Sequence, residues 1–346
     1  MLSNGAEPKS HSAEQQVLDP FDLSIGRPSG SRVNLMTQET IEYGRKWQEA
    51  LMSIALQRAR QGTFPRQFAF SHDWKKLVKE IAKDVESKAQ NKKGPGPLIV
   101  LLGGGGAAGK STFRKELEKL LTRVLKQKLA NGTTTKPVQK LELDQYFYPV
   151  ELILHREADG KYDNPLNSDL LQARRNIETL KKGDDVIIPV HDRNKHKLAE
   201  QTYRLAPELK SARVVIVDGL YSLGPCFQDL GDVGVYIDAS PLDRAKGRVW
   251  RDINVRKRNE EHVVNMLLGR EVYQETFVEP TQTVADYIVR RPHTSGNLTL
   301  GDEKTLHDCF VKACAKEDLA EKEACWQRFI EEQKKKLDEE SAKAEF

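Results

Sequence analysis

An apolar run passes directly into four glycines and then into Gly-Lys-Ser-Thr over residues 98–112, LIVLLGGGGAAGKST. This is the pattern G-x-x-x-x-G-K-[ST] between a predicted strand and a predicted helix, the context that a phosphate-binding loop requires. Glycines let backbone N–H groups converge on a polyphosphate, and the positive N-terminal end of the next helix faces the same point. The segment therefore predicts a bound nucleoside triphosphate. Its predicted nucleotide-binding residues are Gly104, Gly105, Gly106, Ala107, Ala108, Gly109, Lys110, Ser111 and Thr112.

Two other interpretations of these glycines stay open. Gly104, Gly106 and Gly109 also satisfy G-x-G-x-x-G, the pattern of a dinucleotide-binding turn. That fold places an acidic residue about 20 positions further on, after a second strand, whereas here the interval falls within the predicted helix. The dinucleotide-binding interpretation also gives Lys110 and Ser111 no role. A plain turn without a ligand is the second interpretation, although four glycines carry an ordering cost that a plain turn does not need.

Short apolar runs alternate with long amphipathic helices in the rest of this region, which is typical of an α/β fold with a parallel sheet. The five predicted strands cover residues 98–103, 138–144, 214–219, 233–238 and 286–290. The predicted helices cover residues 111–129 and 169–182, with two earlier helices that begin near residues 39 and 74.

Composition divides the chain into four parts. Residues 1–37 are rich in small and polar residues and are expected to form a disordered tail. Residues 38–95 are expected to form a helical extension that ends in a Gly- and Pro-rich linker, and residues 96–300 the main domain. Residues 301–346 are expected to form a charged C-terminal helical segment.

Net charge and cysteine usage limit the classes of partner. The 55 basic and 51 acidic residues leave a charge of +4, which is too small for a dedicated nucleic-acid binder. The four cysteines form no CxxC pair, so neither a disulfide framework nor a zinc site is expected. No basic leader and no run of ~18 apolar residues is present. We therefore expect a cytoplasmic protein whose partner is neither nucleic acid nor a membrane.

Two aspartates follow predicted strands and are candidates for the chemistry. In parallel α/β sheets ligands bind beyond the carboxyl ends of the strands, so Asp144, Asp218 and Lys110 are expected to converge. Asp144 is predicted to be a general base, and Asp218 is predicted to hold magnesium together with the Ser111 hydroxyl. An acid that ends a strand can also be an ordinary loop residue. A GTPase is disfavoured, because the nearest string to its NKxD element, residues 194–197, lacks the acid.

From about residue 97 to 291 the sequence resembles the uridine kinase, phosphoribulokinase and bacterial pantothenate kinase superfamily, and uridine kinases most of all. The motifs that carry the resemblance are GGGGAAGKST, LDQYFY, YDNP followed by SDLL, IPVHDRNKH, VVIVDGLYSL, DRAKGRVWRDINVRKR and FVEPTQTVADYIV. The resemblance implies a P-loop kinase fold: a five-stranded parallel sheet flanked by helices, an Arg-rich lid, and here helical N- and C-terminal extensions. It also implies a magnesium-dependent kinase that uses ATP, and the oligomer formation that is common among such kinases.

The resemblance further assigns residues to roles. Asp144 matches the general base of the family, and Asp163 matches an aspartate that holds ribose hydroxyls in the nucleoside kinases. The arginines that match the lid over the triphosphate are Arg248, Arg251, Arg256 and Arg258, of which the first two join Asp144 and Lys110 as catalytic candidates. The acceptor is expected to contact Asp144, Phe147, Tyr148, Asp163, His191, Arg193 and His196.

The lid assignment is also plausible from charge alone. Residues 243–258 hold seven basic and two acidic residues, an excess larger than that of the whole chain. Such a run is often a solvated helix face. Beside a phosphate loop, however, guanidinium groups can stabilise charge on a transferring phosphoryl group, and closure over the site would exclude water.

The chain departs from uridine kinases in its acceptor pocket. Residues 191–198, HDRNKHKL, keep a histidine and an aspartate but lack the aromatic pair that brackets the base. Arg193 and a neighbouring lysine make this wall cationic, which suits an acceptor with a phosphate or carboxylate better than a neutral pyrimidine. His191 and His196 can equally be surface-loop histidines. Asn164 replaces the usual histidine, and Asp218 stands where glutamate is more frequent.

Three hypotheses follow. The first is an ATP-dependent kinase that phosphorylates a hydroxyl of a small metabolite, either a nucleoside or an anionic sugar or acid. The second is a regulatory module that binds ATP and a protein partner but no longer transfers phosphate. The third is nucleic-acid binding through the lid arginines, which predicts a steep salt dependence.

Overall fold

The computed structural model describes residues 37–63, 66–68, 74–128, 134–148, 163–190, 202–239, 241–252, 256–258, 270 and 273–290. The predictions for the N-terminal tail, for residues 301–346 and for His191, Arg193 and His196 lie outside these residues.

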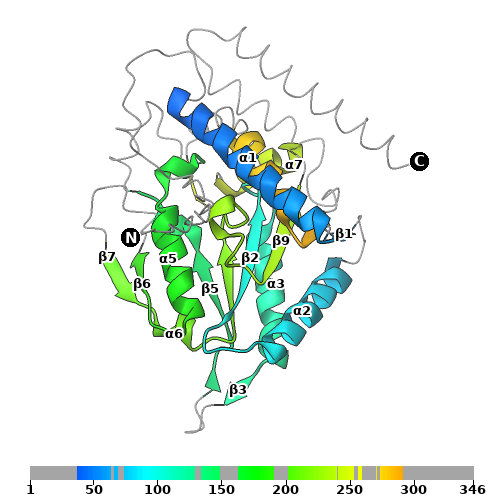
Figure 1. Ribbon diagram of the computed structural model, residues 1–346, viewed down its shortest axis with the longest axis vertical. Coiled ribbons are helices and arrows are strands. Elements are labelled where there is room, and N and C mark those ends of the chain that lie inside the picture. The colour runs from blue at the N-terminus through cyan, green and yellow to red at the C-terminus, as the bar shows by residue number, and fades with distance from the viewer. Residues whose placement is uncertain are drawn as a thin grey trace, which may run out of the picture.

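A parallel six-stranded sheet forms the centre of the protein (Figure 1). Its strand order is β1-β10-β9-β2-β8-β5, and every neighbouring pair is parallel. The strands are β1 (Arg66–Phe68), β2 (Leu98–Gly104), β5 (Val138–Glu142), β8 (Val214–Asp218), β9 (Val233–Asp238) and β10 (Tyr287–Arg290). All five predicted strands are confirmed. The sixth, β1, comes from the N-terminal region and pairs with β10.

The central strands are buried on both faces, which explains why they are continuous runs of Val, Ile and Leu. Along β2 successive side chains alternate between two hydrophobic clusters. Leu98, Val100 and Leu102 belong to one cluster, and Ile99 and Leu101 to the other. The sheet therefore separates two cores.

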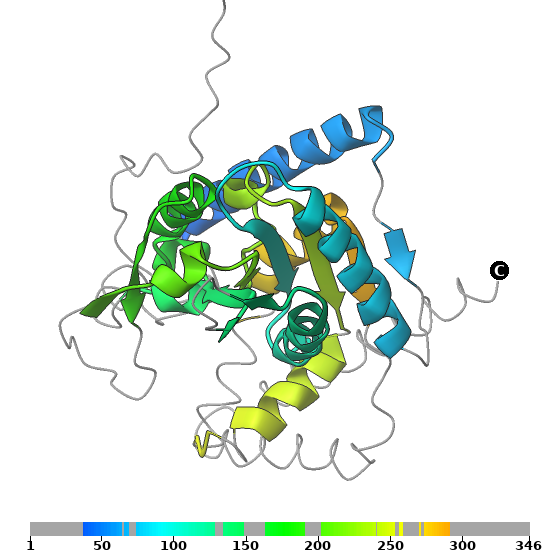
Figure 2. The same cartoon turned by 90° about the horizontal axis from the view of Figure 1, so that it is seen from below.

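Each core is closed by two helices (Figure 2). Helices α2 (Trp74–Asn91) and α3 (Lys110–Val124) cover one face of the sheet, and α1 (Gln38–Arg60) and α5 (Leu170–Lys181) cover the other. The remaining helical elements are η1 (Leu143–Tyr146), η2 (Pro165–Asn167), α6 (Pro207–Lys210), η3 (Pro225–Phe227), α7 (Pro241–Trp250), the π-helix η5 (Gln274–Val278) and η6 (Glu279–Val284). No helix among the described residues is long and apolar enough to cross a membrane.

The helix predicted to run to residue 129 is too long. It ends at Val124, and β3 (Gln127–Lys128) then pairs with β4 (Thr134–Thr135) in a small antiparallel sheet. In this sheet the backbone N–H and C=O groups of the two strands bond to each other, whereas in a longer helix those of β3 would bond within the helix. A second small sheet, β6 (Ile187–Val190) with β7 (Thr202–Leu205), was not predicted either.

Helix α1 packs into the main core, although the sequence suggested an extension. Trp47 is only 1% exposed and contacts Tyr221 and Phe277 edge to face. Its indole Nε1 donates a hydrogen bond to the Phe277 carbonyl at 3.0 Å. Side chains from near both ends of the described chain therefore share one hydrophobic core. The domain boundary predicted near residue 95 stays a prediction.

Candidate active site

The phosphate loop connects β2 to α3 and needs glycine at two positions in particular. Gly104 has φ 130°, and a Cβ there would lie 2.3 Å from the Ile237 carbonyl oxygen. Gly109 precedes α3 with φ 99°, in the left-handed region that favours glycine. Ala107 also has positive φ, at 66°. The loop thus has the positive-φ residues that let a phosphate-binding backbone curl tightly.

Lys110 is the basic group of this loop. Its ammonium donates hydrogen bonds to the carbonyls of Gly104 at 2.7 Å and Gly105 at 2.8 Å. Burial lowers the pKa of Lys110, and the charges of Asp218, Asp144 and, less strongly, Asp163 oppose this change. Three carboxylates from three separate segments therefore lie within electrostatic reach of one ammonium.

Asp218 ends β8 next to the loop and is held by an arginine that the sequence analysis did not single out. Nε of Arg114, on α3, donates to Oδ2 of Asp218 at 2.9 Å. Burial raises the pKa of Asp218, while the charges of Lys110 and Arg114 act in the opposite direction. A further cation near this carboxylate would favour its charged form more strongly.

Asp144 lies in η1, immediately after β5, and is half-buried. Its negative charge raises the pKa of both Lys110 and Asp218, so it faces the same region. Phe147 and Tyr148 follow, half-buried, and pair through their backbones with the segment around η2: Phe147 with Ser168, and Tyr148 N–H with the Asn167 carbonyl at 3.0 Å. These contacts bring the segment after Asp144 against the segment that carries Asp163.

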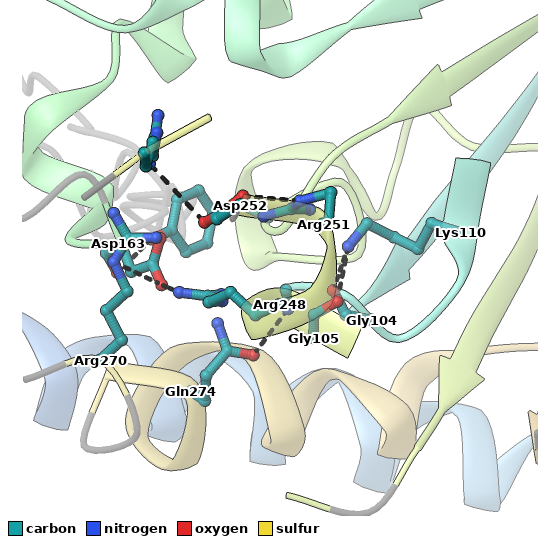
Figure 3. Close-up of polar contacts among 12 residues, drawn as sticks. Gly104, Gly105, Lys110, Asp163, Arg248, Arg251, Asp252, Arg270 and Gln274 are labelled. Carbon is teal, nitrogen blue, oxygen red and sulfur yellow. Dashed lines mark hydrogen bonds and ion pairs between the residues drawn. The ribbon is translucent and has the colours of Figure 1, made fainter. Parts of the chain in front are cut away.

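Asp163 is 4% exposed and is bracketed by two arginines (Figure 3). Its Oδ2 lies 3.4 Å from Nη1 of Arg248 and 3.5 Å from Nε of Arg270. Burial would raise the pKa of Asp163, but the Arg270 and Arg248 charges outweigh it and lower the pKa. Burial lowers the pKa of Arg248 to about 10. Arg248 also covers the phosphate loop, because a Cβ on Gly106 would lie 1.8 Å from its Nη2.

Asp252 forms ion pairs with the other three arginines of the predicted lid. It is 0% exposed, and its Oδ1 accepts from Nε of Arg251 at 2.9 Å and from Nη1 of Arg256 at 3.1 Å. Nη1 of Arg258 lies 3.7 Å from Oδ2. One buried carboxylate therefore neutralises part of a cluster of like charges. A lid that closes over the triphosphate stays a prediction.

Comparison with known proteins identifies the family. The family model described as "Phosphoribulokinase / Uridine kinase family" matches residues 99–296, which is more than half of the chain. The chain belongs to this family. The matched region contains the phosphate loop and every carboxylate described above. Membership indicates a P-loop small-molecule kinase.

Two uridine kinases of known sequence agree with this assignment. A uridine kinase from Macrococcus caseolyticus is 29% identical over 195 residues, covering 55% of this chain and 86% of the relative. A uridine kinase from Shewanella amazonensis is 28% identical over 204 residues, covering 56% and 87%. The solved structure of a possible uridine kinase from Bacillus stearothermophilus matches 62% of this chain and 99% of that chain, with 16% identity and a TM-score of 0.41.

The donor set of this family member suits magnesium bound together with phosphates. Among the described residues no three or more His, Cys, Asp or Glu side chains form a group that could hold a metal ion alone. Mg²⁺ is usually held by one or two carboxylates plus substrate phosphates, with several waters retained. Asp218 and the Ser111 hydroxyl, exposed at the start of α3, fit that requirement.

Sequence reasoning on this kinase missed four polar residues of the site: Arg114, Asp252, Arg270 and Gln274. Asp252 stood within the basic run but was counted only as a charge. Arg114 lies on α3, directly after the phosphate loop. Its place on the buried face of that helix is the one sequence feature that could have marked it. Arg270 and Gln274 carry no local motif, since their neighbours in space come from distant segments.

Replacing Asp252 with asparagine is expected to lower the free energy of unfolding of the kinase by about 1.5–3 kcal/mol, because the amide oxygen can still accept from Arg251 and Arg256 but no longer carries the buried charge that offsets theirs. Urea unfolding followed by circular dichroism measures the change. Asp185→Asn is the matched control, since Asp185 pairs with Lys210 at an exposed site, where ion pairs contribute about 0–1 kcal/mol. Equal effects of the two substitutions would contradict a central role for Asp252.

Proposed function

We propose that this chain transfers the γ-phosphoryl group of ATP, with magnesium, to a hydroxyl of a small metabolite. One observation carries the proposal: β2, β8 and β5 are parallel neighbours that end at one edge of the sheet, where Asp218 and Asp144 follow beside the phosphate loop, and the charges of both raise the pKa of Lys110. A site built only to bind nucleotide needs the loop. A site that also activates an acceptor needs a carboxylate opposite it.

Asp144 is the general base in this proposal. Its carboxylate accepts the proton of the acceptor hydroxyl as the oxygen attacks the γ-phosphorus. Lys110, Arg248 and Arg251 stabilise negative charge on the transferring phosphoryl group. Magnesium would supply positive charge that offsets the negative charge of the phosphates. Ser111 and Asp218 would hold it, with Asp218 kept in place by Arg114.

The charge around Asp163 supports an acceptor that carries an anionic group. Two buried or nearly buried guanidinium groups share a single carboxylate oxygen, so this corner holds more positive than negative charge. An excess charge is costly when buried unless an opposite charge arrives. Asp163 can still hold sugar hydroxyls, as the resemblance to nucleoside kinases implies. A phosphorylated or acidic sugar would use both features.

A coupled assay of ADP release tests the proposal. MgATP is combined with nucleosides, sugar phosphates and sugar acids, and at least one acceptor is expected to raise ADP release well above the rate with water alone. Background rates with every acceptor class, together with tight MgATP binding, would favour the regulatory module instead. A cytoplasmic location and assembly of copies stay predictions, which fractionation and light scattering would test.

A further inference from the structure

Gln274 begins the π-helix η5 and lies against the phosphate loop. It is 1% exposed, and its Oε1 accepts a hydrogen bond from the Gly106 N–H at 3.3 Å (Figure 3). Because a backbone N–H can only donate, this contact fixes which end of the amide faces the loop. Short π-helical turns are rare and occur frequently at functional sites. The side chain therefore has a defined orientation beside a phosphate-binding backbone.

The other end of the Gln274 amide is a buried donor without an acceptor. Among the described residues no hydrogen-bond partner is present for Nε2. In Figure 3 this nitrogen points toward the side chain of Arg248, which is itself a donor and lies against Gly106. Buried polar groups in native proteins are almost always paired, so Nε2 needs an acceptor that the described residues do not supply. An oxygen of a bound phosphate would be such an acceptor.

We infer that Gln274 is a phosphate-binding residue of this kinase: Oε1 stays on the Gly106 N–H, and Nε2 donates to an oxygen of the bound triphosphate. The inference rests on the proposed function, since it assumes that ATP occupies the loop. It adds a residue that lies more than 160 positions after the loop and that none of the motifs above assigns to the nucleotide.

Helix α1 holds Gln274 in place from the opposite side. Trp47 Nε1 donates to the Phe277 carbonyl at 3.0 Å, and Gln48 Nε2 donates to the Thr276 carbonyl at 3.2 Å. Gly44 allows the close approach, because a Cβ there would lie 2.7 Å from Cγ2 of Thr276. Residues that precede the family match thus position a residue within it.

Two substitutions separate phosphate binding from simple support of the loop. Gln274→Glu keeps an oxygen for the Gly106 N–H but replaces the donor Nε2 with an anionic oxygen, which repels phosphate. Gln274→Leu removes both groups. In titration calorimetry with MgATP, we expect Gln274→Glu to bind at least about tenfold more weakly than the native protein, the scale of one hydrogen bond to a charged group. Circular dichroism should show a folded protein.

The support from α1 is tested by a double-mutant cycle. Trp47→Phe removes the indole donor and keeps an aromatic ring in the core. It is expected to weaken MgATP binding in the native background and to have no further effect in Gln274→Leu, because the residue it positions is then absent. Met52→Ala, on the same helix but 61% exposed, is the control and should leave binding unchanged.

The inference is overturned if folded Gln274→Glu binds MgATP as tightly as the native protein, since Gln274 would then only support the loop. It is also overturned if the effects of Trp47→Phe and Gln274→Leu simply add. Failure of the native protein itself to bind MgATP would instead refute the proposed function, so the two failures are distinguishable.

Discussion

Replacing Asp144 with asparagine is expected to lower turnover about 10²–10⁴-fold with the acceptor that gives the highest rate, while MgATP binding stays close to native. The amide keeps the size of the carboxylate but cannot accept a proton from the attacking hydroxyl. Binding should survive because the phosphate loop and the contacts of Lys110 with its carbonyls are not touched by this substitution. Coupled ADP release gives turnover, and titration calorimetry gives the dissociation constant.

A matched control is available in Asp229, an exposed aspartate that pairs with Arg174. Asp229→Asn makes the same chemical change outside the site and should leave turnover unchanged. If Asp144→Asn turned over at the native rate, Asp144 could not be the general base. If it lost MgATP binding as well, Asp144 would act on the nucleotide and the proposed division of roles would be wrong.

Replacing Trp47 with alanine is expected to lower the free energy of unfolding by about 3–5 kcal/mol, the range for large aromatic residues in cores. Trp47 is almost fully buried, contacts two aromatic rings, and satisfies the Phe277 carbonyl. The substitution leaves a cavity in the core under the sheet and an unpaired carbonyl beside the π-helix. Chemical denaturation measures the change.

The same experiment tests whether α1 is a separable extension. Met52→Ala is the control on the exposed face of the helix and should change stability by less than about 0.5 kcal/mol. A fragment of residues 96–300 is expected to be much less stable than the full chain. If the fragment were as stable as the full chain, or if Trp47→Ala unfolded like the native protein, the predicted domain boundary near residue 95 would be supported.

Local signals made the central part of the fold predictable. Strands β2, β8 and β9 are buried on both sides, so each is a run of apolar residues, whereas β5 at the edge of the sheet mixes buried and more exposed residues. The phosphate loop combines a motif, a strand before it and a helix after it. Asp144 and Asp218 could be chosen because parallel strands bring their carboxyl ends to one edge, and the charge of Asp144 raises the pKa of Asp218.

What the sequence did not predict depends on contacts between distant segments. Strand β1 has only three residues, too few for a periodic pattern, and exists because β10 offers an edge. Helix α1 has the amphipathic pattern of any surface helix. That pattern predicts a buried face but does not identify the elements against which the face packs. Arg114, Asp252 and Gln274 acquire their roles from partners that only the folded chain brings close.

The pairing of β1 with β10 and of Trp47 with Phe277 has a consequence for biosynthesis. Both contacts span more than 200 residues, so β1 and α1 cannot reach these partners until the chain has been synthesised as far as residue 290. Long-range pairing slows folding and leaves hydrophobic surface exposed in the meantime. Until then the apolar face of α1 lacks its native partners in η5, and we expect this topology to prolong the aggregation-prone stage of folding.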